Sequence, residues 1–96
     1  MGASAGSASL ADGVESSFFT SNGGATSVYV RVDSGSAVGA LINVPGLHAS
    51  GEFFPMAVGD EHIFRLFDLG IKSIVGKGNG GIATITFGAV AKTIKN

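Results

Sequence analysis

The sequence predicts an all-β fold, namely a compact β-sandwich or jelly-roll-like domain of about seven or eight short antiparallel strands with an extended N-terminal arm. Apolar and polar residues alternate with a period of two in several segments, which is typical of half-buried strands. Turn signals recur roughly every 8–12 residues, as they do in sandwiches and barrels. The stretches free of Gly and Pro are too short for long helices.

The chain divides into a small-residue arm, residues 1–13, and a single β domain, residues 14–96. Leu10 is the only large side chain in the arm after Met1. Because such a segment cannot bury enough apolar surface to fold alone, we expect it to be flexible or extended and to be ordered by a partner surface.

The clearest strand covers residues 27–33, where Val28, Val30 and Val32 share one face. The other strands show the same alternation less completely. They are expected, in chain order, over residues 14–20, 37–44, 52–58, 70–75, 82–87 and 89–94. Pro55 places the strand over 52–58 at a sheet edge or a bulge, because proline cannot donate a ladder hydrogen bond.

Three polar, glycine-containing segments predict hairpin turns. Residues 22–24 (Asn-Gly-Gly) and residues 33–36 would each reverse the chain between consecutive strands. Residues 76–81 would form a third hairpin with a long, flexible tip. This last segment departs from the phosphate-loop pattern, which requires an earlier Gly and a Ser or Thr after the Lys.

Residues 60–69 fit two structures. Ile63, Leu66 and Phe67 have the spacing of one face of a short helix. A strand over 61–67 instead places alternate residues, beginning with His62, on one side. The strand agrees better with the β pattern on both flanks.

No cofactor, metal site or catalytic residue is expected. His48 and His62 lack metal-ligand spacing, and no Ser lies in a nucleophile-elbow motif. Because the chain has no Cys, it cannot form a disulfide or a Cys-based metal site. The net charge of −1 disfavours nucleic-acid binding and polybasic membrane contact. No apolar run is long enough to span a membrane and no leader is visible, so we expect folding in the cytoplasm.

The balance of apolar and charged residues predicts an oligomer or a subunit of a larger assembly. Hydrophobic residues make up 45% of the chain and charged residues only 14%, against roughly 25% charged in an average domain. A small monomer cannot hide that much apolar surface. The residues expected to contact partners are those of the arm and four aromatic residues: Gly2, Ala3, Ser4, Ala5, Gly6, Leu10, Phe18, Phe19, Phe53 and Phe54.

Three segments, residues 51–55, 59–64 and 77–88, together with the arm and the low charge, make the chain resemble the capsid decoration (cement) proteins of tailed bacteriophages. This resemblance implies a homotrimer on the virion surface that bridges subunits of the major capsid protein. A phage tail or neck component is an alternative. A small carbohydrate-binding module is another, with Tyr29, Phe53 and Phe54 as a stacking platform.

Overall fold

Seven β-strands account for the regular structure in the computed structural model, which describes residues 3–66 and 70–91. They are β1 (Ala3–Leu10), β2 (Ser16–Val32), β3 (Ala40–Asn43), β4 (Phe54–Met56), β5 (Glu61–Arg65), β6 (Ile71–Gly78) and β7 (Ala83–Ala91). All pairings between these strands are antiparallel. Within the described residues, no helix is long and apolar enough to cross a membrane.

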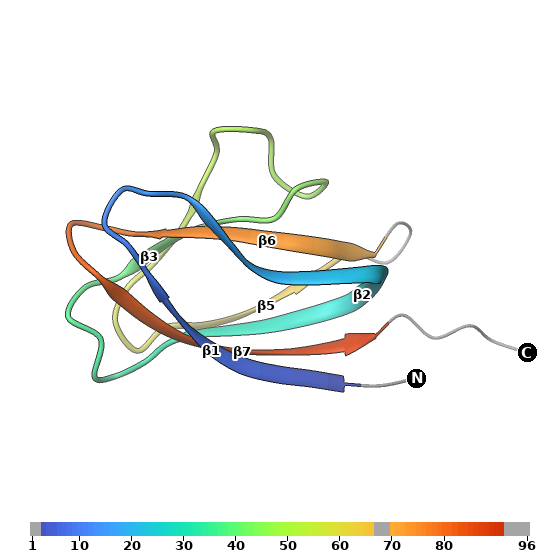
Figure 1. Cartoon of the computed structure of the whole chain (residues 1–96), viewed down its shortest axis with the longest axis horizontal. Helices are drawn as coiled ribbons and strands as arrows, with labels where there is room; N and C mark the ends of the chain where they lie inside the picture. Colours follow the sequence, from blue (N-terminus) through green and yellow to red (C-terminus); the bar gives the residue numbers. More distant parts are fainter. Residues whose placement is uncertain (1–2, 67–69, 92–96) are drawn as a thin grey trace, which may run out of the picture.

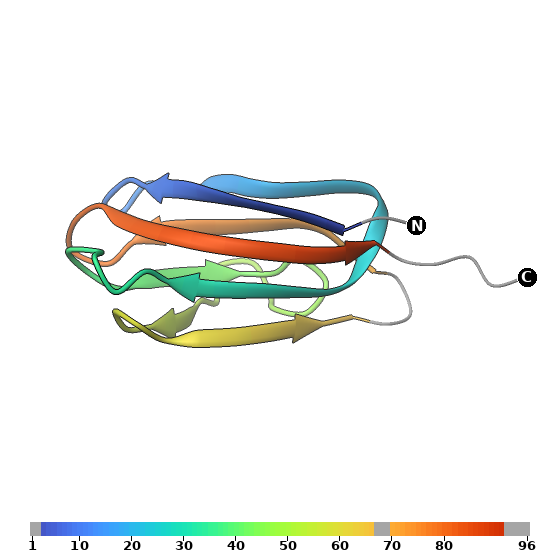
Figure 2. The ribbon, with the colours of Figure 1, turned by 90° about the horizontal axis from the view of Figure 1, so that it is seen from below.

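The strands form two layers that share the long strand β2 (Figures 1 and 2). The first part of β2 pairs with β6, which continues the layer through β3 to β4. The second part pairs with β7 on one side and β5 on the other, and β1 completes that layer beyond β7. The predicted all-β sandwich is therefore confirmed.

A bend in β2 carries the strand from one layer to the other. Gly24 has a φ of 81°, and Gly70, with a φ of 77°, lies against it. A Cβ at Gly70 would stand 3.0 Å from the Cα of Gly24, so the backbones meet closely at this corner. The hairpin expected at residues 22–24 is wrong, because the two halves of β2 pair with different strands instead of with each other.

The other two expected hairpins are also wrong, although a turn forms at residues 33–36. The amide of Ser36 donates to the carbonyl of Asp33 at 2.9 Å, but β2 and β3 do not pair. Likewise β6 and β7 are not paired and belong to different layers. Both connections cross between layers, since turn chemistry reverses the chain without specifying which strand it then joins.

The tip at residues 76–81 is anchored, contrary to the flexible tip expected. The amide of Gly78 donates to the carbonyl of Ala11 at 2.8 Å, and Gly13 donates back to the carbonyl of Gly78 at 3.1 Å. The carboxylate of Asp12 accepts from the amide of Gly80 at 3.1 Å. These bonds fix the tip to the segment that follows β1.

Strand boundaries differ from the expected ones along most of the chain. The strands expected over 14–20 and 27–33 are joined in β2, the one over 37–44 shortens to β3, and the one over 70–75 extends to Gly78 in β6. The strand expected over 52–58 shortens to β4, which lies at an edge as Pro55 predicted. The strands expected over 82–87 and 89–94 merge into β7, and residues 92–96 lie outside the described residues. The strand alternative for residues 61–67 is confirmed by β5 over Glu61–Arg65, and the helix alternative is wrong there; residues 67–69 lie outside the described residues.

The core lies between the two layers and is formed by alternate residues of the strands. Val28, Val30 and Val32 are fully buried on one face of β2, as their spacing predicted. The buried apolar residues are Leu10, Phe19, Ala25, Val28, Val30, Val32, Ala40, Ile42, Val44, Met56, Phe64, Ile71, Ile74, Ala83, Ile85 and Ala89.

The N-terminal segment is extended, but the surface that orders it differs from the partner surface that we expected. β1 pairs with β7 along its whole length, from Ala3 opposite Val90 to Leu10 opposite Ala83. The side chain of Leu10 is 0% exposed, so it belongs to the core. The surface that orders residues 3–10 is therefore a strand of the same chain.

Candidate interaction surfaces

The outer edge of β1 is the first candidate surface. β1 stands at the end of the strand order and pairs with no described strand other than β7. Its eight residues contain no charge and no Pro. Ser7 and Ser9 are exposed, whereas Gly6 and Ala8 are partly covered on the core side.

The other sheet edges carry protective features that β1 lacks. β4 has three residues and contains Pro55, and β5 carries Glu61 and Arg65. The first part of β2 has two register shifts against β6, which interrupt a regular edge. Proteins protect edge strands from pairing with other chains by short length, Pro, charge or bulges. Among the described edges, β1 is therefore the least protected.

Two of the residues expected to contact partners are buried in the core of the chain itself. Leu10 and Phe19 are 0% and 6% exposed, so their side chains are unavailable to another protein, and this expectation is corrected. Phe18 is half-buried and packs on Phe87 with ring centroids 5.5 Å apart. A register shift between Ser17 and Phe19 lets consecutive Phe residues both approach Phe87.

The other expected contact residues fall in two places. Ala3, Ser4, Ala5 and Gly6 belong to β1, and Gly2 lies outside the described residues.

Phe53 and Phe54 make contacts within the chain but remain partly exposed. The Nζ of Lys77 lies 4.3 Å from the ring centroid of Phe53, a cation–π contact. Phe54 lies 4.4 Å from His62 and 6.4 Å from His48, measured between ring centroids. The two imidazoles thus pack around a Phe ring.

The proposed stacking platform is not assembled from all three aromatic residues. Tyr29 belongs to the half of β2 that pairs with β5, and it stands opposite Ile63. Phe53 instead contacts Lys77 of β6, which belongs to the other layer. Within residues 3–66 and 70–91, no group of three or more His, Asp or Glu side chains is placed to hold a metal ion.

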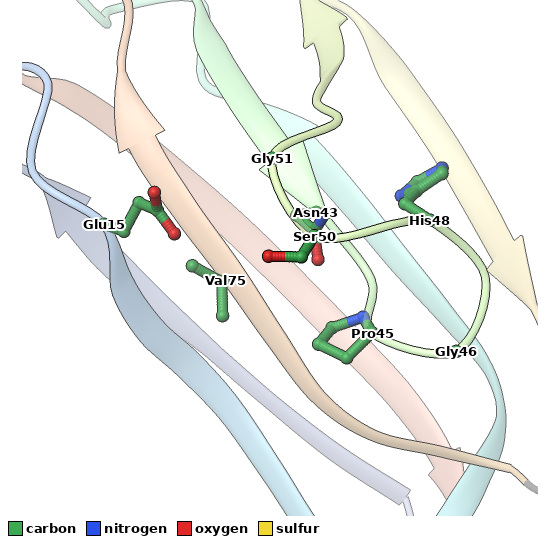
Figure 3. Close-up of a pocket in the computed structure, with 8 residues that line it drawn as sticks. All are labelled: Glu15, Asn43, Pro45, Gly46, His48, Ser50, Gly51 and Val75. Carbon is green, nitrogen blue, oxygen red and sulfur yellow. The ribbon is translucent and has the colours of Figure 1, made fainter.

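The second candidate surface is a pocket of about 410 Å³ on the outer side of the β2–β6–β3 layer (Figure 3). Val75 stands opposite both Ser17 of β2 and Asn43 of β3, and it forms the floor. The loop over residues 45–51 borders one side and Glu15, just before β2, borders the other. The lining residues are Glu15, Asn43, Pro45, Gly46, His48, Ser50, Gly51 and Val75.

Hydrogen bonds hold the loop beside this pocket in place. Asn43, which is only 7% exposed, donates from Nδ2 to the carbonyls of Ala49 at 2.8 Å and Glu52 at 2.6 Å. The Glu52 carboxylate accepts from the amide of Ala49 at 3.0 Å. Nδ1 of His48 accepts from the amide of Val44 at 3.0 Å, so the loop is fixed at both ends.

Sequence reasoning missed this pocket. Glu15 and Asn43 are far apart in the chain and are brought together only because β2 and β3 both pair with β6. No local motif signals such a juxtaposition. A polar residue at the end of an apolar strand, immediately before Pro45-Gly46, is the one local sign that Asn43 has a structural role.

No protein-family model and no curated protein matches this chain. Among solved structures, the chain is similar to one described under "Bacillus endospore appendages form a novel family of disulfide-linked pili". The similarity covers 94% of this chain and 89% of that chain, with a TM-score of 0.46 and 14% sequence identity. The function therefore has to be inferred from the surfaces of the chain itself.

Proposed function

We propose that the chain is a non-enzymatic structural protein of a virion, a decoration protein that forms a homotrimer on a phage head and bridges subunits of the major capsid protein. The observation that carries this proposal is the open edge of β1, eight residues without charge or Pro. A role in assembly accounts for an edge that a monomeric protein would protect.

The physical basis is strand addition. An unpaired edge presents backbone amides and carbonyls that a strand of another chain can pair with. Each such hydrogen bond contributes roughly 0.5–1.5 kcal/mol net, and several act together along an edge of this length. In the proposed trimer this pairing joins the subunits through their β1 edges. The three subunits then contact the capsid lattice together, and the second and third contacts become intramolecular.

The small side chains of β1 suit close approach by another strand. Ser7 and Ser9 alternate with Gly6 and Ala8. None of these four residues has a side chain large enough to obstruct a strand that pairs with this edge. A Cβ at Gly6 would lie 2.9 Å from Cζ of Phe87, so a side chain at this position would have to displace that ring. The edge of β1 is thus regular, carries small side chains over residues 6–9 and has no charged residue.

The test is a double substitution that charges this edge, Ser7→Lys with Ser9→Lys. Both side chains are exposed, so the variant is expected to keep the circular dichroism spectrum of the parent, while its melting temperature falls only by what subunit association contributes. Lysines on an edge repel an incoming strand, so the trimer should dissociate in light scattering coupled to size exclusion. The matched control, Ser34→Lys with Ala37→Lys, adds the same charge at an exposed turn and should stay trimeric.

A monomeric parent protein, or a charged-edge variant that assembles like the parent, would overturn the proposal. Immunogold labelling of virus particles from the source culture tests the location. Gold on heads supports a decoration protein, whereas gold on tails assigns the chain to the tail or neck instead.

A further inference from the structure

The pocket of Figure 3 is lined by hydrogen-bond acceptors of three residues, with Glu15 on one side and Asn43 and Ser50 on the other. The Glu15 carboxylate forms no ion pair or hydrogen bond with any residue of the described ranges 3–66 and 70–91. Both donor positions of Asn43 are committed to backbone carbonyls, which leaves its Oδ1 as the remaining polar atom. Figure 3 shows Ser50 and Glu15 reaching into the space from opposite sides.

We propose that this pocket binds the guanidinium group of an arginine side chain carried by a partner protein, an inference that rests on the proposed assembly function for the source of that side chain. A carboxylate accepts hydrogen bonds only, and so does an amide oxygen. A site made of such groups selects a ligand that is rich in donors and positively charged. Sugar hydroxyls would need donors from the pocket as well. Among the lining side chains the free donors are the hydroxyl of Ser50 and Nε2 of His48, whose Nδ1 accepts from the amide of Val44.

The shape favours guanidinium over an ammonium ion. Acceptors spread across the pocket match the five donors of a planar guanidinium, whereas an ammonium is a compact point charge. Pro45 and Val75 add apolar surface to the lining, against which a weakly hydrated planar cation can pack. The pocket volume of about 410 Å³ accommodates the end of an arginine side chain together with the main chain that carries it.

The loop that borders the pocket is held in place by hydrogen bonds within the chain, so the site is preorganised. Asn43 fastens the loop through Ala49 and Glu52, and His48 fastens its other end to Val44. A preorganised site avoids the entropy cost of ordering a loop on binding. Glu52 lies in the adjoining depression beside His48 and adds negative charge near the site.

The experiment is a nitrogen-15 correlation NMR titration of the full chain with N-acetyl-arginine amide. Saturable shift changes are expected at the amides of Glu15, Ser50 and Gly51, with affinity in the millimolar range that suits a single side chain. Glu15→Gln keeps the shape but removes the charge, and it should weaken binding about tenfold. Glu61→Gln is the matched control, because it removes the same charge from β5 in the other layer.

Further ligands make the result decisive. N-acetyl-lysine amide should bind more weakly than the arginine probe. The proposal is overturned if arginine causes only unsaturable or scattered shifts, or if Glu15→Gln binds as well as the parent. Saturation by glucose or by calcium chloride, without saturation by arginine, would assign the pocket to a sugar or a metal ion and equally overturn the proposal.

The two proposals fail separately. The variant with lysines at Ser7 and Ser9 should lose the trimer but keep arginine binding, since β1 lies outside the pocket lining. Glu15→Gln should keep the trimer and bind arginine about tenfold more weakly. A monomeric parent that binds arginine would overturn the assembly proposal and leave the guanidinium site intact.

Discussion

Replacing Leu10 with Ala distinguishes an integral first strand from a free arm. Leu10 is completely buried, and its Cδ1 would lie 2.8 Å from a Cβ added at Gly76, so the side chain fills a tightly packed site. Truncating a buried Leu to Ala costs about 2–5 kcal/mol, through lost burial and the cavity left behind. We expect a loss of about 3 kcal/mol in the free energy of unfolding.

Urea denaturation followed by circular dichroism measures this loss, at one fixed protein concentration because association adds to apparent stability. For a domain of this size each kcal/mol lowers the melting temperature by about 4–8 °C, so the expected decrease is about 12–24 °C. Val14→Ala is the control, since Val14 is 59% exposed and should change stability by less than about 0.5 kcal/mol. If Leu10→Ala matched this control, residues 3–10 would not belong to the core, and the reasoning would be refuted.

Three further predictions follow from particular contacts. Gly78→Ala should lower the free energy of unfolding by more than about 4 kcal/mol or prevent folding, because a Cβ there collides with the backbone of Gly81. Solubility and circular dichroism measure this effect. Gly35→Ala is the control and should be tolerated, because a Cβ at Gly35 would meet no atom within 4 Å. Asn43→Ala should lower the free energy of unfolding, measured by urea denaturation, by about 2–3 kcal/mol, because two backbone carbonyls lose their donors. A decrease below about 0.5 kcal/mol would contradict the role given to the Asn43 amide. Burial, followed by the neighbouring Glu61 carboxylate, raises the pKa of the Tyr29 hydroxyl above 10.0. Tyr29 is the one Tyr in the chain, so ultraviolet absorbance follows its titration directly, and Glu61→Gln should lower the midpoint toward 10.0. The raised pKa stabilises the fold fully below the pKa of the unfolded chain, and this contribution is lost as pH rises through the folded value.

Alternation along single strands was predictable, whereas the pairing of strands was not. The burial of Val28, Val30 and Val32 on one face of β2 could be predicted, because alternation with a period of two is visible within the strand's own sequence. Residues 22–24 have the composition of a hairpin turn, yet they bend a strand whose halves join different layers. Partner choice depends on the burial of whole faces, which no short segment encodes.

The first strand was missed for a different reason. Ser7 and Ser9 alternate with Ala8 and Leu10, which is the period of a strand. Apart from Leu10, the inward residues are so small that the segment has the composition of a disordered arm. At Gly6 the space that a side chain would occupy is filled by the ring of Phe87 from β7.

Pairing of β1 with β7 has a consequence for synthesis on the ribosome. β1 leaves the ribosome before all other strands, but its partner is the last of the seven to appear. Until then Leu10 has no completed core to enter, and both edges of β1 are unpaired. Contacts this distant in sequence also slow folding, because a long loop must close before they form. The nascent chain is therefore exposed to premature strand pairing with its neighbours on a polysome, at the same edge that stays unpaired among the described strands of the finished protein.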